Sequence, residues 1–252
     1  MQLMRAMILA AGKGTRLRPV TETVPKPLVD VCGRPMIALA LDLLRQAGIL
    51  EVVINLHHLG HLIRSALGDG SRYGVHISYS EEEPILDTGG GIEAARQFLG
   101  DDTFVVVNAD VVLDLRLQEV IEFHRRQKAT ATLVLRTDPR AERNDDVGID
   151  SGHRIRRFLG RSYAACTNER YFFGSVHVAE PRLFDYMQPG VYSITRDVYP
   201  RLLAAGEPIA GYVHQGYWRV LDTPGDLAAG RRELSDGAPG PRQSRRQDLN
   251  RQ

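Results

Sequence analysis

Strand-like and helix-like segments alternate through the first half of the chain, and this alternation limits the possible folds more than any other feature. Apolar runs such as Ala6 to Ala11 and Phe104 to Val107 alternate with segments of helical periodicity, including Met36 to Ala47 and Leu117 to Gln127. Parallel strands need crossover helices between them, and strands buried on both faces are continuously apolar. The pattern predicts an α/β fold with a mainly parallel sheet between two helical layers.

The pattern changes at about residue 130, where β-like runs follow one another with few helices between them. These runs are Thr132 to Leu135, Val147 to Asp150, Arg154 to Phe158 and Tyr171 to Val178. We expect an antiparallel extension here, which makes the sheet mixed. The sequence predicts one domain over residues 1–235, with halves of about 1–129 and 130–235. Residues 236–252 have almost no apolar side chains, so we expect a disordered tail.

Charge and cysteine content exclude several classes of protein. The 32 basic and 31 acidic residues nearly cancel, so no global field favours nucleic acid or an anionic membrane. Cys32 and Cys166 lie far apart and match no metal-ligand or disulfide pattern. Gly12 and Lys13 end the apolar N-terminal run before a signal peptide or membrane span is complete. We expect a cytoplasmic protein with neither a nucleic-acid nor a membrane partner.

A glycine-rich loop with fixed cations follows the first predicted strand. The strand runs directly into Gly12-Lys13-Gly14-Thr15-Arg16-Leu17-Arg18-Pro19, and the two glycines permit close approach of backbone N–H groups to an anion. Ten residues after Arg16, the prolines of Pro25-Lys26-Pro27 stiffen the backbone around one lysine. The spacing matches neither the P-loop nor the dinucleotide fingerprint. It predicts a phosphate-binding loop of another kind.

The run from Leu9 to Pro19, followed by Pro25-Lys26-Pro27-Leu28, resembles the signature of sugar-phosphate nucleotidyltransferases. The resemblance extends over about residues 5–235 and implies a Rossmann-like α/β/α sandwich, with a nucleoside triphosphate and a sugar 1-phosphate as partners. It implies that Arg16 stabilises the departing pyrophosphate and that Lys26 contacts the reacting phosphates. The nucleotide contacts that it implies in the loop are Leu9, Ala10, Ala11, Gly12, Gly14 and Thr15.

Two aspartates are candidate ligands of a magnesium ion. Transfer onto anionic phosphates needs a divalent cation held by carboxylates, which collect at strand ends. Asp110 follows the run Phe104 to Val107 and resembles the family's metal aspartate, whereas alone it would be a turn or helix-cap residue. The preceding Asn108 is a candidate sugar contact.

The second aspartate stands in a shifted position. The family pattern near the C-terminal end is similar to Trp-x-Asp-Ile-Gly-Thr-Pro, but after Trp218 this chain has Val220 at the aspartate position and Asp222 two residues later. Two residues along a strand keep the side chain on the same face. We expect Asp222 to bind the metal. The alternative is that it only caps a helix beginning at Pro224.

The segment Glu81-Glu82-Glu83-Pro84-Ile85-Leu86-Asp87-Thr88-Gly89-Gly90-Gly91 precedes a predicted helix near Gly91 to Leu99. It resembles a family segment that lies against the nucleoside, so Gly89 and Gly90 are candidate nucleotide contacts. Glu83 can accept two hydrogen bonds from guanine, which favours GTP. We expect Glu81 and Glu82 to be solvated. The alternative for the whole segment is a flexible loop with an acidic surface.

Substrate identity has competing interpretations. Phe173-Gly174-Ser175-Val176-His177-Val178 is similar to mannose-1-phosphate guanylyltransferases, which makes GTP and mannose 1-phosphate the first expectation and Gly174 a candidate sugar contact. The usual Glu-Lys-Pro sugar motif is replaced by Leu159-Gly160-Arg161, and N-acetylmuramate-1-phosphate uridylyltransferases carry a similar Thr-Gly-Gly-Gly-Ile segment. A non-catalytic sensor on the same scaffold is a third interpretation, and a homodimer is one possible assembly.

Overall fold

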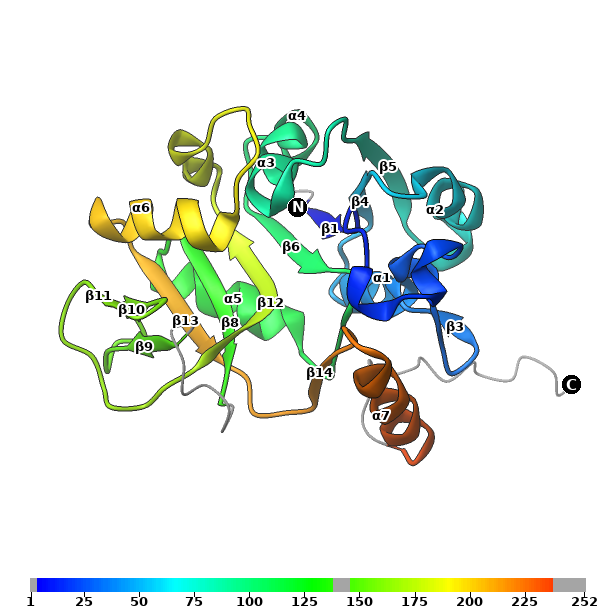
Figure 1. The fold of residues 1–252 in the computed structure, drawn as a ribbon. Coiled ribbons are helices and arrows are strands. Elements are labelled where there is room, and N and C mark those ends of the chain that lie inside the picture. Colours follow the sequence, from blue (N-terminus) through cyan, green and yellow to red (C-terminus); the bar gives the residue numbers. More distant parts are fainter. Residues whose placement is uncertain (1–3, 138–145, 238–252) are drawn as a thin grey trace, which may run out of the picture.

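The computed structural model describes residues 4–137 and 146–237, and a seven-stranded sheet lies at its centre (Figure 1). The strand order is β13 (Ile209–Val213), β8 (Ala131–Arg136), β12 (Phe172–Ala179), β6 (Phe104–Asn108), β1 (Arg5–Leu9), β4 (Glu51–Leu56) and β5 (His76–Glu81). Within this sheet β12 runs antiparallel to β6 and β8, and the other neighbours are parallel. The predicted mixed, mainly parallel sheet is confirmed.

Helices cover both faces of the sheet. One face packs against α1 (Ile37–Gln46), α2 (Gly60–Leu67) and α5 (Leu117–Gln127), and the other against α3 (Asp87–Ala94), α4 (Arg96–Leu99) and α6 (Tyr199–Ala204). Alternation along β1 divides the core, because Ala6 and Ile8 join the first group and Met7 joins the second. All three are fully buried. The Rossmann-like three-layer sandwich is therefore confirmed.

The second half extends this sheet and adds a small one. A separate antiparallel sheet consists of β9 (Val147–Ile149), β10 (Ile155–Phe158) and β11 (Arg161–Ser162). The expected antiparallel pairing holds for β12, but β13 runs parallel to β8. β12 returns the chain to the edge where β8 begins, and the helical segments Pro181–Tyr186 and Ile194–Val198, together with α6, then connect β12 to β13 on the other side of β8.

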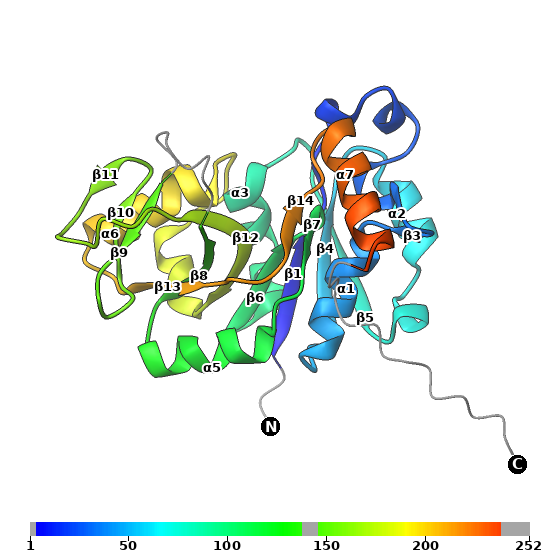
Figure 2. The same cartoon turned by 90° about the horizontal axis from the view of Figure 1, so that it is seen from below.

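The last described segment returns to the N-terminal loop. Strand β14 (Trp218–Val220) pairs with β7 (Val111–Leu113), and α7 (Pro224–Ser235) follows directly. Figure 2 shows α7 beside β14 and α1, and Leu227 packs in one cluster with Met36 and Leu39. No helix among residues 4–137 and 146–237 is long and apolar enough to cross a membrane. Most of the predicted tail, residues 238–252, lies outside the described residues.

Candidate active site

The glycine-rich loop lies at the carboxyl end of the central strands. β1 and β6 pair in parallel with Leu9 opposite Asn108, so the loop after β1 and Asp110 after β6 emerge at the same level. Gly14 has φ +61°, and a Cβ there would lie 3.0 Å from both Lys26 Cβ and Thr21 Cγ2. The Thr21 hydroxyl donates to Gly14 O at 2.7 Å. Glycine is therefore required for this close packing of the loop onto the lysine segment.

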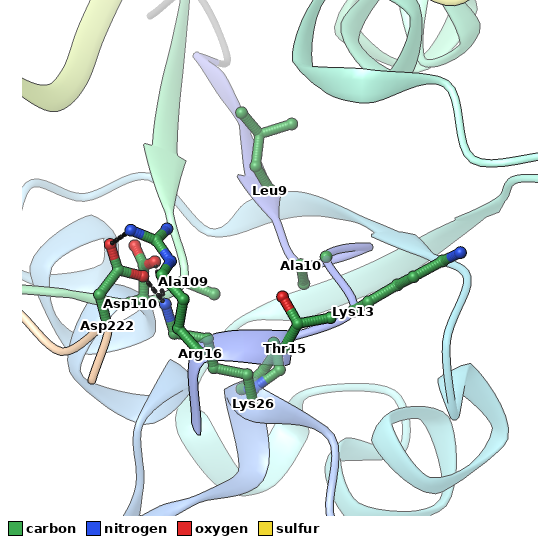
Figure 3. A pocket seen from close by; sticks show the side chains of 12 residues that line it. Leu9, Ala10, Lys13, Thr15, Arg16, Lys26, Ala109, Asp110 and Asp222 are labelled. Carbon is green, nitrogen blue, oxygen red and sulfur yellow. Dashed lines mark hydrogen bonds and ion pairs between the residues drawn. The ribbon is translucent and has the colours of Figure 1, made fainter. Parts of the chain in front are cut away.

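Four charged side chains from distant parts of the chain meet beside this loop (Figure 3). Lys26 Nζ donates to Asp110 Oδ2 at 2.5 Å and also to Asp222 Oδ1. Arg16 Nη1 lies 2.8 Å from Asp222 Oδ2. The Lys26 side chain is 12% exposed and that of Arg16 is 69% exposed. Two cations thus balance two carboxylates, with the lysine held between them and the arginine facing solvent.

A cavity of about 270 Å³ surrounds this charged set. Its lining comes from the loop and both strand ends: Leu9, Ala10, Gly12, Lys13, Gly14, Thr15, Arg16, Lys26, Pro27, Ala109, Asp110 and Asp222. Nine of the predicted site residues are in this lining, and Figure 3 shows Lys13 directed away from the carboxylates.

A second cavity of about 420 Å³ adjoins the first and shares Leu9, Gly12 and Asp110 with it. The rest of its lining is Ala11, Asn55, Glu82, Ile85, Asp87, Thr88, Asn108 and Val191. The predicted Ala11 and Asn108 are therefore brought to the site. Sequence reasoning missed Asn55 and Val191, although a polar residue near the end of the apolar run Val52 to Leu56 is a detectable signal.

The helix-cap alternative for Asp222 is wrong. Thr223 is the N-cap of α7, since its hydroxyl accepts from Asp226 N and the Asp226 carboxylate accepts from Thr223 N. Leu221 N donates to Asp110 O at 2.9 Å, which brings the next side chain beside Asp110. Val220 pairs with Val111 in the two-stranded sheet that β14 and β7 form. The carboxylate is thus free of a capping role and reaches the lysine.

The expectation of solvated glutamates is right for Glu81 and wrong for Glu82. Glu81 is exposed and pairs with Arg64 at 2.6 Å, whereas Glu82 is buried and lines the second cavity. Strand β5 ends at Glu81, and the turn that follows directs the Glu82 side chain inward toward Asn55. Glu83, the predicted base-reading residue, is exposed and lines neither cavity.

The three glycines lie inside α3 rather than ahead of it. A Cβ at Gly89 would lie 2.5 Å from the Tyr192 ring, and one at Gly90 would lie 2.0 Å from Gly190 O. The helix therefore packs against the backbone of the 190–192 segment, and the neighbouring Thr88 lines the second cavity. Gly89 and Gly90 line neither cavity, and their nucleotide contact stays a prediction.

Gly174 lies on β12 and lines neither cavity. Its carbonyl accepts from Trp218 Nε1 at 3.0 Å, and a Cβ there would lie 3.1 Å from Val134 O. The position therefore has a packing requirement of its own.

Several curated proteins are similar to this chain. It is 37% identical over 241 residues to the mannose-1-phosphate guanylyltransferase of Mycobacterium tuberculosis, an alignment that covers 94% of this chain and 66% of that protein. It is 37% identical over 223 residues to the N-acetylmuramate alpha-1-phosphate uridylyltransferase of Neisseria meningitidis, covering 87% and 94%. For the UTP--glucose-1-phosphate uridylyltransferase of Synechocystis sp., identity is 36% over 220 residues, covering 81% and 56%. The chain thus spans only part of the length of two of these relatives.

Solved structures share the fold. A structure from Bacillus anthracis assigned as a glucose-1-phosphate thymidylyltransferase superposes with a TM-score of 0.79 at 24% identity, covering 92% of this chain and 96% of that one. HddC from Yersinia pseudotuberculosis in complex with GMP-PN superposes with a TM-score of 0.76 at 20% sequence identity, covering 92% of this chain and 99% of that one. Residues 5–235 match the family described as nucleotidyl transferase. Together with the relatives, this match shows that the chain belongs to the sugar-phosphate nucleotidyltransferase family.

Proposed function

We propose that the protein transfers a nucleoside monophosphate from a nucleoside triphosphate to a sugar 1-phosphate and releases pyrophosphate. The observation that carries this proposal is the convergence of Arg16, Lys26, Asp110 and Asp222 on one cavity beside a glycine-rich loop. The loop supplies backbone donors for a triphosphate, and the fixed cations match its charge. The names of the relatives describe the same class of reaction on mannose, N-acetylmuramate and glucose phosphates.

The reaction is an in-line displacement without a protein nucleophile. A phosphate oxygen of the sugar 1-phosphate forms a bond to the α-phosphorus, and the bond from that phosphorus to the pyrophosphate oxygen breaks. Arg16 stabilises the charge that grows on the leaving pyrophosphate, and Lys26 contacts the reacting phosphates. The side chains that line the second cavity, Asn108 among them, orient the sugar and the nucleoside.

The two aspartates fit a magnesium ion. Asp110 Oδ1 is buried and has no hydrogen-bond partner among the described residues, so one of its lone pairs faces no donor. No group of three or more metal-ligating side chains occurs within the described part of the chain. A pair of carboxylates is compatible with Mg²⁺, which keeps water and phosphate oxygens as its other ligands. When bound there by Asp110 and Asp222, it would neutralise charge on the phosphate oxygens.

GTP and mannose 1-phosphate are the first substrates to test, and UTP with N-acetylmuramate 1-phosphate or another hexose 1-phosphate is the alternative. The relatives that carry these two activities are equally identical to the chain at 37%. We place the reaction in the cytoplasm, because Cys32 and Cys166 form no disulfide framework. We expect neither nucleic acid nor membrane as partner, because acidic and basic residues nearly cancel. A homodimer is one possible assembly.

A matrix of nucleoside triphosphates against sugar 1-phosphates, read out by pyrophosphate release, tests the proposal. We expect turnover with one pair well above the others and dependence on added Mg²⁺. Binding of nucleotide without turnover for every sugar phosphate would instead indicate the non-catalytic sensor. The retained cations and carboxylates of the first cavity argue against that alternative, because a sensor needs no group that stabilises a leaving pyrophosphate.

A further inference from the structure

A buried chain of hydrogen bonds joins the glycine-rich loop to the far side of the second cavity. Ala10 N donates to Asn55 Oδ1 at 2.7 Å, and Asn55 Nδ2 donates to Glu82 Oε1 at 2.7 Å. Leu86 N donates to the other Glu82 oxygen at 2.8 Å. Both side chains are almost completely buried, at 3% and 4% exposure. Two residues outside the charged set thus connect the start of the loop to the segment that carries Ile85 and Thr88.

The surroundings leave room for this connection. A Cβ at Gly91 would lie 2.5 Å from Glu82 Oε1 and 2.9 Å from Asn55 Nδ2, so α3 leaves space where these two side chains meet. Glu82 has no ion-pair partner within the described residues and accepts its hydrogen bonds from an amide and a backbone N–H. Burial of a carboxylate without a cation is unfavourable for stability. Its presence on a cavity wall therefore favours a role in binding.

We propose that Asn55 and Glu82 are positioning residues that set the separation between the two ends of a bound nucleotide. On the proposed function, on which this inference rests, the triphosphate lies on the loop held by Asn55, and the nucleoside lies against Ile85 and Thr88, which Glu82 holds. A rigid separation lowers the ordering cost of binding a ligand that contacts both ends. Neither side chain needs to touch the reacting atoms.

The variant Glu82→Gln tests the connection. Both partners of the Glu82 carboxylate, Asn55 Nδ2 and Leu86 N, are hydrogen-bond donors. The amide of a glutamine can accept from only one of them, and its NH₂ group would then face the other donor. We expect the KM for the nucleoside triphosphate, and its dissociation constant measured by calorimetry, to rise by about tenfold or more. The dissociation constant of inorganic tripolyphosphate, measured in the same way, should stay within about twofold of wild type. Asn55→Ala removes the acceptor of Ala10 N as well, and should weaken both ligands.

A paired substitution separates positioning from direct contact with the base. In Asn55→Asp combined with Glu82→Gln, the carboxylate at position 55 accepts from Ala10 N and from the new amide, whose oxygen accepts from Leu86 N. All three hydrogen bonds return, so we expect the KM to recover to within about threefold of wild type. A matched control is Glu81→Gln on the exposed surface, which should leave KM unchanged.

Three results would overturn the proposal. They are a paired variant as impaired as Glu82→Gln, equal losses for triphosphate and tripolyphosphate in Glu82→Gln, and a fall in thermal stability with no change in either affinity. The comparison of the two ligands needs no turnover. If the wild-type protein fails to release pyrophosphate with any substrate pair, the proposed reaction fails, and the binding comparison still decides the role of Asn55 and Glu82.

Discussion

At the scale of single residues, Asp222 is the carboxylate that departs most from the family pattern. It lies just after strand β14 and forms ion pairs with both Lys26 and Arg16. The N-cap of α7 is the adjacent Thr223. The two residues therefore have separate structural roles, although they are neighbours in the sequence, and substitutions distinguish these roles.

Asp222→Asn should keep the fold and lower turnover by on the order of 10²-fold, because an amide carries no charge to hold a hard cation. The matched control is Thr223→Ala, which should lower the free energy of unfolding by about 1 kcal/mol and change turnover far less. Steady-state kinetics over a magnesium titration, with thermal unfolding of each variant, provides the measurement. Wild-type magnesium dependence in folded Asp222→Asn would contradict the metal role.

Arg16 is largely exposed, so its ion pair with Asp222 contributes at most about 1 kcal/mol to stability. We expect Arg16→Ala to unfold at nearly the wild-type temperature and to lose about 10²-fold or more in turnover, with a smaller change in nucleotide affinity. Arg18→Ala, an exposed arginine of the same loop, serves as the control. If Arg16→Ala turns over as fast as Arg18→Ala and the wild type, Arg16 has no part in pyrophosphate departure.

At this scale the sequence predicted the candidate phosphate-binding residues of the loop, but it did not predict which acidic side chains are buried. Gly14 and Lys26 were predicted from local spacing, and the structure places them together. Glu82 could not be told from Glu81 or Glu83, because three consecutive glutamates have the same local pattern. Only the point where β5 ends, and the position of Asn55 on the neighbouring strand, decide which carboxylate turns inward.

At the scale of elements, local periodicity predicted α5 at its observed bounds and both central strands closely, because their apolar faces are continuous. The start of α3 was predicted too late. Glycine is a poor helix former, and a helix through Gly89, Gly90 and Gly91 forms only because the 190–192 segment packs directly against it. That contact spans about a hundred residues and leaves no local signal.

Gly90→Ala tests this packing. The new Cβ would lie 2.0 Å from Gly190 O, so we expect a loss of about 1–3 kcal/mol in the free energy of unfolding. The control is Gly225→Ala in the exposed first turn of α7, where the nearest atom would be 3.7 Å away. That variant should be stabilised by up to about 1 kcal/mol. Urea denaturation measures both, and equal effects at the two positions would refute close packing of α3.

At the scale of the whole molecule, the sheet combines a predictable half with a less predictable one. The parallel strands β1, β4, β5 and β6 follow from alternating strands and helices. The placement of β13 beside β8 depends on the tertiary path of the helical segments between β12 and β13, which the sequence pattern did not reveal. The division into nucleotide and sugar halves remains a prediction.

The core makes stability depend on pH through His177, which is fully buried and hydrogen-bonded to the Tyr199 hydroxyl. Burial lowers the pKa of His177 to about 3, from 6.5 in the unfolded chain. The unfolded state therefore binds one more proton between these values. Stability should fall by about 1.4 kcal/mol per pH unit as pH decreases below 6.5.

Chemical denaturation at pH 7, 6 and 5 measures this slope. All three pH values lie above 4.5, the ordinary pKa of the ion-paired Glu207, so protonation of that carboxylate contributes little to the slope. His177→Leu should remove most of it, and replacement of the exposed His61 by Gln should not. An unchanged slope in His177→Leu would assign the effect to other groups.

The position of Lys26 between Asp110 and Asp222 has a thermodynamic consequence for the order in which ligands bind. In the free protein the carboxylates already have a counter-charge, so a divalent cation must compete with an ammonium group for them. A triphosphate offers Lys26 and Arg16 new partners and leaves the carboxylates available. Nucleotide and metal affinities are then linked, because binding of either ligand raises the affinity for the other by the same factor.

Mn²⁺ titrated by electron paramagnetic resonance should bind the free protein at least about tenfold more weakly than the complex with a non-hydrolysable nucleotide. Lys26→Met should narrow that difference, and equal Mn²⁺ affinities in the wild type would show that the lysine is no competitor. The nucleotide, on this account, completes the metal site that acts on it.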